Sequence, residues 1–278
     1  MRPVVIPHHI KKLWQPGTTI SRQIAFVKEY YPALLKTGND VSVVIPAYNE
    51  AKNILKTLAS LVLNKTMFSV EIVVVNNNST DDTEMLLQQC GVRYVNEKIQ
   101  GITAARNAGL KAAQGKYIVN ADADAIYPPN WIDCMVRPLH ASNNIALTYG
   151  RFSFLPEGKT GRGSYYIYEH AADLLRLMHK YMKEEAVNVY GFNSAFRRND
   201  GVAVNGFDHP PGTNEDGYLA VKLRDGGFGK LHYVTDTKAL VWVSDRRIQA
   251  DGGLFKAVKK RVTRIFFPRK YKETRADL

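Results

Sequence analysis

Cysteine is scarce in this sequence, which has only Cys90 and Cys134 among its 278 residues. The two lie far apart and in no spacing that is typical of metal ligands. We therefore expect two reduced thiols with a structural role, which suits a cytosolic compartment.

Long apolar runs are also missing, and none approaches the roughly 18 residues that a membrane-spanning helix needs. The first ten residues do not resemble a signal peptide, because Pro3, Pro7, His8 and His9 interrupt them. These absences predict a soluble, cytoplasmic protein that at most rests on the inner face of a membrane.

Positive charge is in excess and unevenly placed. The formal net charge is +12, and residues 246–278 carry eleven basic and three acidic side chains, a net +8. Such a tail is compatible with contacts to nucleotide phosphates, to an anionic lipid surface or to nucleic acid. It is equally compatible with a solvated helix face that only aids solubility.

Strands and helices alternate along residues 41–120. β-Branched runs at 41–46, 71–75, 92–95 and 116–120 predict buried strands, and helical spacing separates them at 49–63, 79–90 and 102–113. This alternation predicts an α/β fold with a Rossmann-like, mostly parallel central sheet and helices on both faces. Later elements are weaker: helices at 21–36, 131–140, 165–183 and 215–224, and extended segments at 145–154, 191–197 and 230–234.

Polar side chains gather where the predicted strands end, at 48–50, 76–82 and 122–124. Ligands of open α/β sheets bind at these carboxyl ends. Asp122 and Asp124 are one residue apart on such a loop, and hard cations such as Mg²⁺ or Mn²⁺ bind carboxylates together with substrate phosphates. The pair is a candidate metal site, although Asp-x-Asp alone is a weak pattern.

Two further charged pairs have both a functional and a structural interpretation. Glu215 and Asp216 open a predicted helix, where they either favour the helix dipole or place Asp216 as a general base. Arg246 and Arg247 either clamp a diphosphate or form an exposed basic turn.

The order of these motifs decides between the interpretations, because together they closely resemble the family-2 glycosyltransferases of the GT-A fold. The resemblance covers about residues 41–247. It rests on segments 41–50, 75–81, 101–109, 115–118, 122–124, 191–198 and 205–216. It implies a GT-A catalytic domain at 40–247, with a nucleotide-binding half at 40–127 and an acceptor half at 128–247. Residues 1–39 would be an N-terminal extension, and 248–278 a basic C-terminal helix or tail.

The resemblance also implies roles for single residues. Asp124 would be the metal ligand, Asp122 would lie near the metal or ribose, and Asp216 would be the catalytic base of an inverting single displacement. Asn193 and Glu215 would lie on the acceptor side. The remaining donor-binding candidates are Pro46, Ala47, Tyr48, Glu50, Asn77, Arg106, Arg246 and Arg247.

The expected reaction is the Mn²⁺- or Mg²⁺-dependent transfer of one sugar from a nucleotide sugar, with UDP preferred, to an unidentified glycan, lipid-linked or small-molecule acceptor. This reaction would belong to the synthesis of a polysaccharide, a glycolipid or a cell-envelope glycan. Asn76 stands where the family usually has an acidic residue, which weakens the inference of uracil specificity. The Gln-x-x-Arg-Trp motif of processive synthases is absent, which favours single-sugar transfer.

Two alternatives stay open. A nucleotidyltransferase also uses paired aspartates, but it normally has a glycine-rich basic loop where this chain has residues 46–50. A non-catalytic nucleotide or nucleic-acid binder would act through the basic tail, whose few aromatic residues make nucleic acid a poor partner. Residues 254–272 have the spacing of a basic amphipathic helix, which either contacts a membrane or packs on its own domain.

Overall fold

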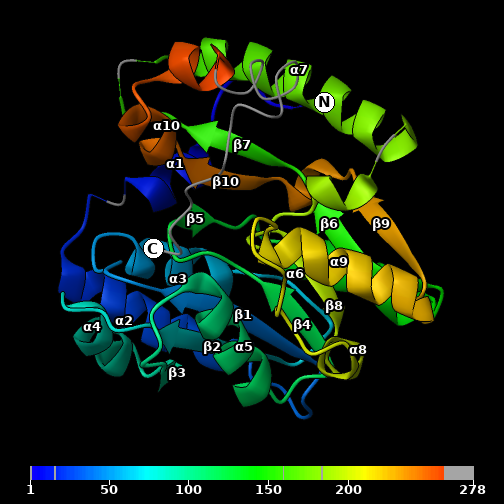
Figure 1. Cartoon of the computed structure of the whole chain (residues 1–278). Helices are drawn as coiled ribbons and strands as arrows, with labels where there is room; N and C mark the ends of the chain where they lie inside the picture. The colour runs from blue at the N-terminus through cyan, green and yellow to red at the C-terminus, as the bar shows by residue number, and fades with distance from the viewer. Residues whose placement is uncertain (1, 16, 159, 183, 260–278) are drawn as a thin grey trace.

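The computed structural model describes residues 2–15, 17–158, 160–182 and 184–259. Seven strands form a large mixed sheet in the order β3-β2-β1-β4-β8-β6-β9, and three more form a small sheet in the order β5-β10-β7 (Figure 1). The strands of the large sheet are β1 (Val41–Ala47), β2 (Val70–Asn76), β3 (Arg93–Asn96), β4 (Tyr117–Asn120), β6 (Ile145–Gly150), β8 (Ser194–Arg197) and β9 (Lys230–Val234). Those of the small sheet are β5 (Ala125–Ile126), β7 (Phe152–Leu155) and β10 (Val241–Ser244).

Pairing in the large sheet is parallel except around β8, which runs antiparallel to both β4 and β6. The expected α/β fold with a mostly parallel central sheet is therefore confirmed. Strand β1 lies between β2 and β4, so the loops that follow these three strands meet at one edge. That edge carries the polar segments that the sequence singled out.

Helices cover both faces of the large sheet, as the alternation of side chains along a strand requires. Val43 and Ile45 of β1 belong to one apolar cluster, which includes residues of α2, α3, α4 and α6. Val44 between them belongs to a second cluster with residues of α5 and α9. The bounds of these helices are α2 (Ile20–Tyr30), α3 (Ile54–Val62), α4 (Thr83–Cys90), α5 (Ile102–Ala112), α6 (Trp131–Ala141) and α9 (Glu215–Leu223).

Helix α5 lies unusually close to β1 because Gly109 has no side chain. A Cβ at Gly109 would lie 2.3 Å from Cγ1 of Val44. A larger residue would push α5, and with it Arg106 one turn earlier, away from the sheet.

The described part of residues 1–39 packs onto the rest of the protein. Helix α1 (His8–Trp14) places Ile10 and Trp14 against Trp242 and other apolar residues of the small sheet. Helix α2 places Val27 in the main core, and the Tyr31 hydroxyl accepts a hydrogen bond from the Ile72 amide at 3.0 Å. Helix α1 was not expected from the sequence, and the expected helix at 21–36 ends at Tyr30, just before a turn that contains Pro32.

Other expected boundaries also need correction. The extended segment expected at 145–154 is two strands in different sheets, because the chain leaves the large sheet at Arg151. The segment expected to be extended at 191–197 is a strand only from Ser194. Both cysteines are free thiols, as expected.

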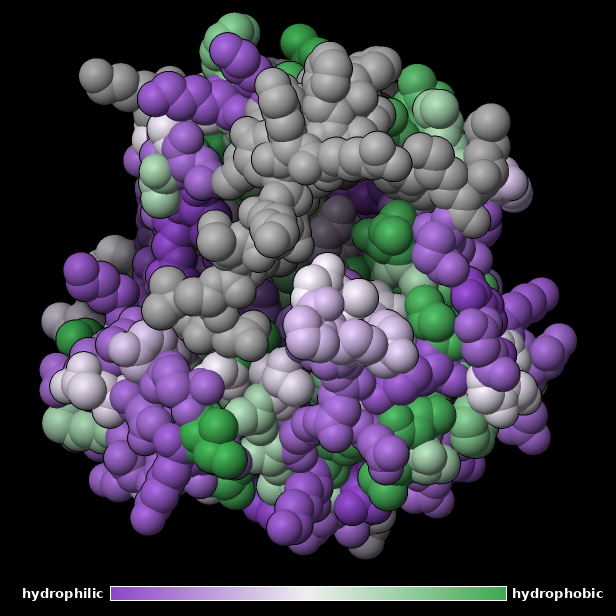
Figure 2. Space-filling model, viewed as in Figure 1, coloured by the Kyte–Doolittle hydropathy of each residue, from purple (hydrophilic) through white to green (hydrophobic). Residues whose placement is uncertain are grey.

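Three further α-helices have the bounds α7 (Arg162–Met182), α8 (Arg198–Ala203) and α10 (Arg246–Ala250), and a π-type turn, η3, spans Arg224–Phe228. Short 3₁₀ turns occur at η1 (Tyr31–Ala33), η2 (Glu185–Asn188) and η4 (Thr237–Ala239). Figure 1 shows the small sheet between α7 and the large sheet. In the same view, Figure 2 shows a mostly hydrophilic surface over the large-sheet half, with hydrophobic residues scattered singly among polar ones.

Residues 254–259 are helical, and residues 260–272 of the expected amphipathic segment lie outside the described residues. None of the described helices has the length and apolar character needed to cross a bilayer.

Candidate active site

The loops after β1 and β2 are tied to each other at the edge of the sheet. Asn49 takes a left-handed backbone conformation with φ 54°, and its side-chain oxygen accepts from the Thr80 amide at 2.8 Å. The Glu50 amide donates to Oγ1 of Thr83 at 2.9 Å. Because neighbouring loops hold Glu50 in this way, its carboxylate has a fixed position at the mouth of the site.

The Asp-x-Asp loop exposes its carboxylates because the alanines beside them are buried. Ala121 and Ala123 pack in the main core, and the carbonyl of Ala123 accepts from Oγ1 of Thr57 at 2.8 Å. The side chains of Asp122 and Asp124 remain 21% and 15% exposed. Both carboxylates therefore keep access to a ligand from the open side.

The small sheet brings Arg246 to this loop. Val243 of β10 pairs with Ala125 of β5, so the residues just after β10 lie near those just before β5. Arg246 forms ion pairs with Asp124, at 2.9 Å from Nη2 to Oδ2, and with the carboxylate of Glu50. Arg247 beside it is exposed.

Burial and the nearby charge of Asp122 raise the pKa of Asp124 above its ordinary value, while Arg246 opposes this shift. A buried carboxylate is costly to ionise on its own, and a nearby cation lowers this cost. In this structure Arg246 supplies that positive charge.

Arg106 links the Asp-x-Asp loop to the predicted base. It is 2% exposed on α5, and its Nη2 donates to Oδ1 of Asp122 at 3.0 Å. Its Nε lies 3.3 Å from Oδ1 of Asp216 at the start of α9. One buried guanidinium thus contacts two carboxylates that are far apart in the sequence.

The cluster of Arg106, Asp122 and Asp216 contains buried polar atoms that lack hydrogen-bond partners. Among the described residues, Nη1 of Arg106 and Oδ1 of Asp216 have no hydrogen-bond partner. Burial raises the pKa of Asp216 to about 7, although Arg106 acts in the opposite direction. A carboxylate with a pKa near neutrality is suited to proton transfer at physiological pH.

Gly191 makes room for this arrangement. A Cβ at this position would lie 2.2 Å from Nη2 of Arg106 and 2.4 Å from both oxygens of Asp216. The side chain of Asn214 caps α9 by accepting from the Gly217 amide at 3.1 Å, which fixes the first turn that carries Asp216. The predicted base, Asp216, therefore lies at a capped helix start and packs against a glycine.

The other donor-site candidates at this edge of the sheet differ in how exposed their side chains are. Pro46 and Ala47 end strand β1, and Tyr48 after them is exposed. Asn77 is buried, and its Nδ2 donates to the carbonyl of Ile99 while its oxygen accepts from the Gly101 amide at 2.9 Å. The structure thus uses the Asn77 side chain to hold the loop before α5.

Asn193, which was expected on the acceptor side, lies at the junction between the two sheets in the structure. Asn193 is fully buried, its oxygen accepts from Nε1 of Trp131 at 2.8 Å, and its Nδ2 donates to the Arg151 carbonyl at 2.7 Å. These bonds stabilise the junction between the two sheets and leave the amide no open side. Glu215 is half-buried beside Asp216.

Two features of the site were missed in the sequence analysis. Tyr127 is fully buried under the Asp-x-Asp loop, and its hydroxyl accepts from the Asp122 amide at 2.8 Å. The contact of Arg246 with Glu50 joins residues at opposite ends of the catalytic region. The only sequence signal for the role of Tyr127 is its position shortly after Asp124, and the contact of Arg246 with Glu50 has none.

The neutral Asn76, which departs from the family pattern, has a local explanation. Its Nδ2 donates to Oδ1 of Asn96 at 2.9 Å and lies 3.4 Å from Oε2 of Glu84. An acidic residue here would face the Glu84 carboxylate, so an amide fits this surrounding better.

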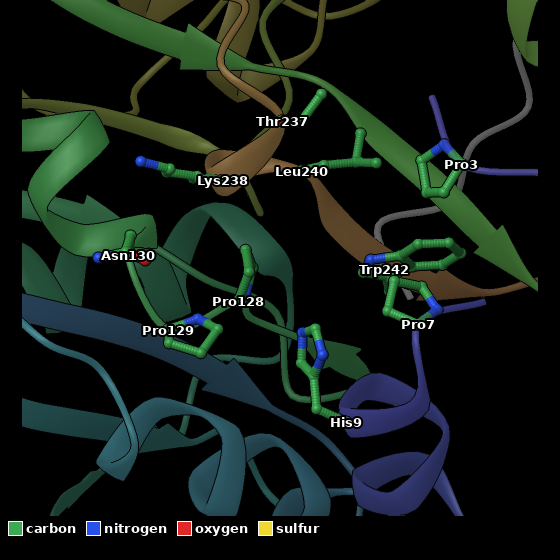
Figure 3. Close-up of a pocket in the computed structure, with 10 residues that line it drawn as sticks. All are labelled: Pro3, Pro7, His9, Pro128, Pro129, Asn130, Thr237, Lys238, Leu240 and Trp242. Carbon is green, nitrogen blue, oxygen red and sulfur yellow. The ribbon is translucent and has the colours of Figure 1, made fainter. Parts of the chain in front are cut away.

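A separate pocket of about 480 Å³ lies away from these aspartates, on the side of the small sheet that faces α1 (Figure 3). Its walls are rich in proline and include His9, Lys238 and Trp242. Asp122, Asp124 and Asp216 do not line it.

Comparison with solved structures identifies the fold. Glucosyl-3-phosphoglycerate synthase from Mycobacterium tuberculosis, in complex with Mn²⁺, UDP-glucose and phosphoglyceric acid, superposes with a TM-score of 0.53 at 22% identity over 90% of this chain and 84% of that one. A mannosyltransferase from Pyrobaculum calidifontis, in complex with GDP-Man and Mn²⁺, gives 0.55 at 20% identity over 88% and 76%. The fold is the GT-A fold of nucleotide-sugar glycosyltransferases.

Sequence comparison then places the chain in a family. Residues 42–200, more than half of its length, match glycosyl transferase family 2, and the chain belongs to this family. Chondroitin synthase from Escherichia coli is 32% identical over 123 residues, which are 42% of this chain and 18% of that protein. An uncharacterized glycosyltransferase from Haemophilus influenzae is 32% identical over 127 residues, 44% of this chain and 39% of that protein.

The matched segments thus span less than half of these relatives. The family, the fold and the enzyme class expected from the sequence are confirmed.

Proposed function

We propose that this protein transfers a single sugar from a nucleotide-sugar donor to an acceptor hydroxyl by an inverting, single displacement. The observation that carries the proposal is the double contact of Arg106 with Asp122 and Asp216. It supports the proposal because one side chain contacts both the predicted metal motif and the predicted base.

A divalent cation fits the residues at this point. Among the described residues no group of three or more His, Cys, Asp or Glu side chains could hold a metal. Mn²⁺ or Mg²⁺ does not need such a cage, because one or two carboxylates together with substrate phosphates suffice. Asp124 and Asp122 are two accessible carboxylates of the right kind, and we assign them as the metal ligands.

A bound cation would neutralise negative charge on the departing nucleoside diphosphate. Arg246, and Arg247 next to it, would donate charge-assisted hydrogen bonds to the same phosphates. Glu50 would hold the Arg246 guanidinium toward the ligand. The positive charges of the cation and of the two arginines would lie next to the diphosphate, where negative charge grows during the reaction.

Asp216 would accept the proton of the attacking hydroxyl. A positioned general base contributes typically 10²–10⁴-fold to the rate. Arg106 would keep the Asp216 carboxylate turned toward the Asp-x-Asp loop. Gly191 leaves the space that this orientation requires.

A UDP-sugar is the donor that we propose, with Tyr48 and the loop held by Asn77 next to the nucleotide. The M. tuberculosis structure contains UDP-glucose and the P. calidifontis structure contains GDP-Man, so a GDP-sugar is the first competitor. The acceptor would be a glycan, a lipid-linked sugar or a small molecule in polysaccharide, glycolipid or cell-envelope glycan synthesis.

Calorimetric titration of UDP, GDP and CMP, each with and without Mn²⁺, tests this function. We expect one nucleotide to bind in a metal-dependent way to the native protein, and Asp124→Ala to abolish this binding. Asp236→Ala, which removes a carboxylate from the loop before β10, is the matched control and should bind like the native protein. Absence of binding by all three nucleotides under both conditions would contradict the proposal.

A further inference from the structure

Helix α7 presents its apolar side to solvent. Ile167, Leu174 and Tyr181 are 72%, 63% and 76% exposed, and Leu177 and Met178 between them are exposed as well. With Ala171 they recur at intervals of three and four residues, which is the spacing of one helix face. None of the exposed residues described in α7 is Asp, Glu, Lys or Arg.

The charged residues of α7 point inward instead. Arg162 pairs with Glu169 at 2.8 Å, and Nε of Arg2, from the N-terminal segment, lies 2.7 Å from Oδ2 of Asp173. Arg176 also contacts Asp173. Rotating α7 to bury its apolar face would separate these buried charges, which is unfavourable. The ion pairs therefore lock the apolar face outward.

Such a face differs from the rest of the described surface. Large apolar side chains such as Met67 and Ile99 are also exposed elsewhere, but at sequence positions without the helical spacing found on α7. Isolated exposed apolar residues are ordinary, whereas a contiguous set marks an interaction surface. On α7 the set extends over most of a 21-residue helix, roughly 31 Å long.

Basic residues lie near the beginning of α7. The Tyr165 hydroxyl of α7 donates to Oδ2 of Asp245 at 2.7 Å, which ties α10 to the helix. Just after α10, Phe255 is 82% exposed, and Lys256 and Lys259 are exposed beside it. Figure 1 shows this segment at the same end of the molecule as α7. The sequence that follows, 260–278, contains seven basic and two acidic residues.

We propose that the outward face of α7, together with residues 254–259, binds the surface of an anionic lipid bilayer. Apolar side chains would enter the boundary between headgroups and acyl chains, and lysines would contact lipid phosphates. Charge favours this occupant over a second copy of the chain, because a copy would bring the same positive charge to the interface. The proposal does not depend on the sugar-transfer reaction, and its test uses no donor.

Cosedimentation with vesicles tests the proposal directly. The full chain is mixed with vesicles of phosphatidylcholine alone and with vesicles that also contain phosphatidylglycerol. We expect binding to the anionic vesicles only, weakened by salt. The double variant Leu174→Glu/Met178→Glu should lower this binding at least about tenfold, because it places charge in the apolar contact.

The matched control is Met67→Glu/Ile99→Glu, which adds the same charges at exposed apolar positions outside α7 and should bind like the native protein. Lys256→Gln/Lys259→Gln should weaken binding to anionic vesicles and reduce its salt dependence. Far-ultraviolet circular dichroism would show that all variants are folded.

Two results would overturn the proposal. One is equal vesicle binding by the native chain and by Leu174→Glu/Met178→Glu. The other is a native dimer in sedimentation velocity that this variant dissociates while no vesicle binding is seen, which would assign the face to a second copy.

Discussion

The guanidinium of Arg246 lies 2.9 Å from the carboxylate of Asp124 and also contacts Glu50. The carboxylate assigned to the metal is thus already neutralised by a side chain of the same protein. A metal cation and the Arg246 guanidinium would compete for the Asp124 carboxylate. A ligand with phosphates could contact both of them. This relationship makes Arg246 the residue whose removal separates metal binding from nucleotide binding.

Arg246→Gln should therefore act in opposite directions on two ligands. Mn²⁺ alone should bind a few-fold more tightly, because Asp124 no longer has a competing positive charge; the effect is small since Arg246 is 40% exposed. The nucleoside diphosphate in the presence of Mn²⁺ should bind about tenfold more weakly, because a charge-assisted hydrogen bond is lost.

Isothermal titration of each ligand measures both effects. Arg137→Gln removes an exposed arginine that pairs with Asp133 on α6 and is the control for net charge. Parallel weakening of both ligands by Arg246→Gln would show that the arginine supports the metal site and does not compete for it.

Activity should depend on pH through Asp216. Burial raises the pKa of this carboxyl to about 7, and only its ionised form can accept a proton. We expect kcat/KM to rise about tenfold per pH unit below neutrality and to level off above it. Initial rates from pH 5 to 9 give the profile, and Asp216→Asn should remove nearly all activity while leaving metal-dependent nucleotide binding intact. A profile that is flat down to about pH 5 would exclude Asp216 as the base with this pKa.

Arg106→Met should destabilise the protein. It leaves Asp122 and Asp216 without their shared cation, and breaking a buried ion pair from one side costs about 3–5 kcal/mol. Urea unfolding measures the change in the free energy of unfolding. The double variant Arg106→Met/Asp216→Asn should recover part of the loss, because one of the two uncompensated carboxylates is gone. Equal stability of the single and double variants would mean that Asp216 is not held by Arg106.

Gly191→Ala tests the space between Arg106 and Asp216. The new methyl group would displace one of them, so we expect kcat to fall at least about 100-fold, as misplacement of a catalytic group does. Gly161→Ala is the matched control, since a Cβ there meets no atom within 4 Å. Steady-state kinetics and nucleotide titration on both variants separate a displaced base from a lost donor site. Full activity of Gly191→Ala would show that the backbone yields and that the base is not confined.

Part of this architecture could be predicted from the sequence because its signals are local. Strands β1 and β2 are nearly continuous β-branched runs, and Asp122 and Asp124 follow a buried strand directly. Helix α1 has only seven residues, no side-chain cap and Pro7 before it. It is therefore too short and too weakly marked to be predicted from a periodic pattern. Strand β5 has two residues and exists only because β10 pairs with it.

The rest depends on contacts between distant segments. Neighbouring residues in the sequence do not reveal that Arg106 lies between two aspartates, or that Arg246 meets Glu50. Asn193 was expected on the acceptor side from the family motif, but the motif did not reveal that Trp131 and Arg151 bind its amide. The outward apolar face of α7 was unforeseen for the same reason, since one partner of Asp173 is Arg2, which lies 171 residues away in the sequence.

The order β5-β10-β7 of the small sheet has a consequence for biosynthesis. Strand β10 lies between the other two, so they have no neighbour in this sheet until Val241–Ser244 has left the ribosome. A nascent chain that stops earlier already contains Asp122, Asp124 and Asp216 but not Arg246. The proposed donor site would thus be completed only after Arg246 has been translated, and products that end before this residue should be unable to retain a nucleotide sugar.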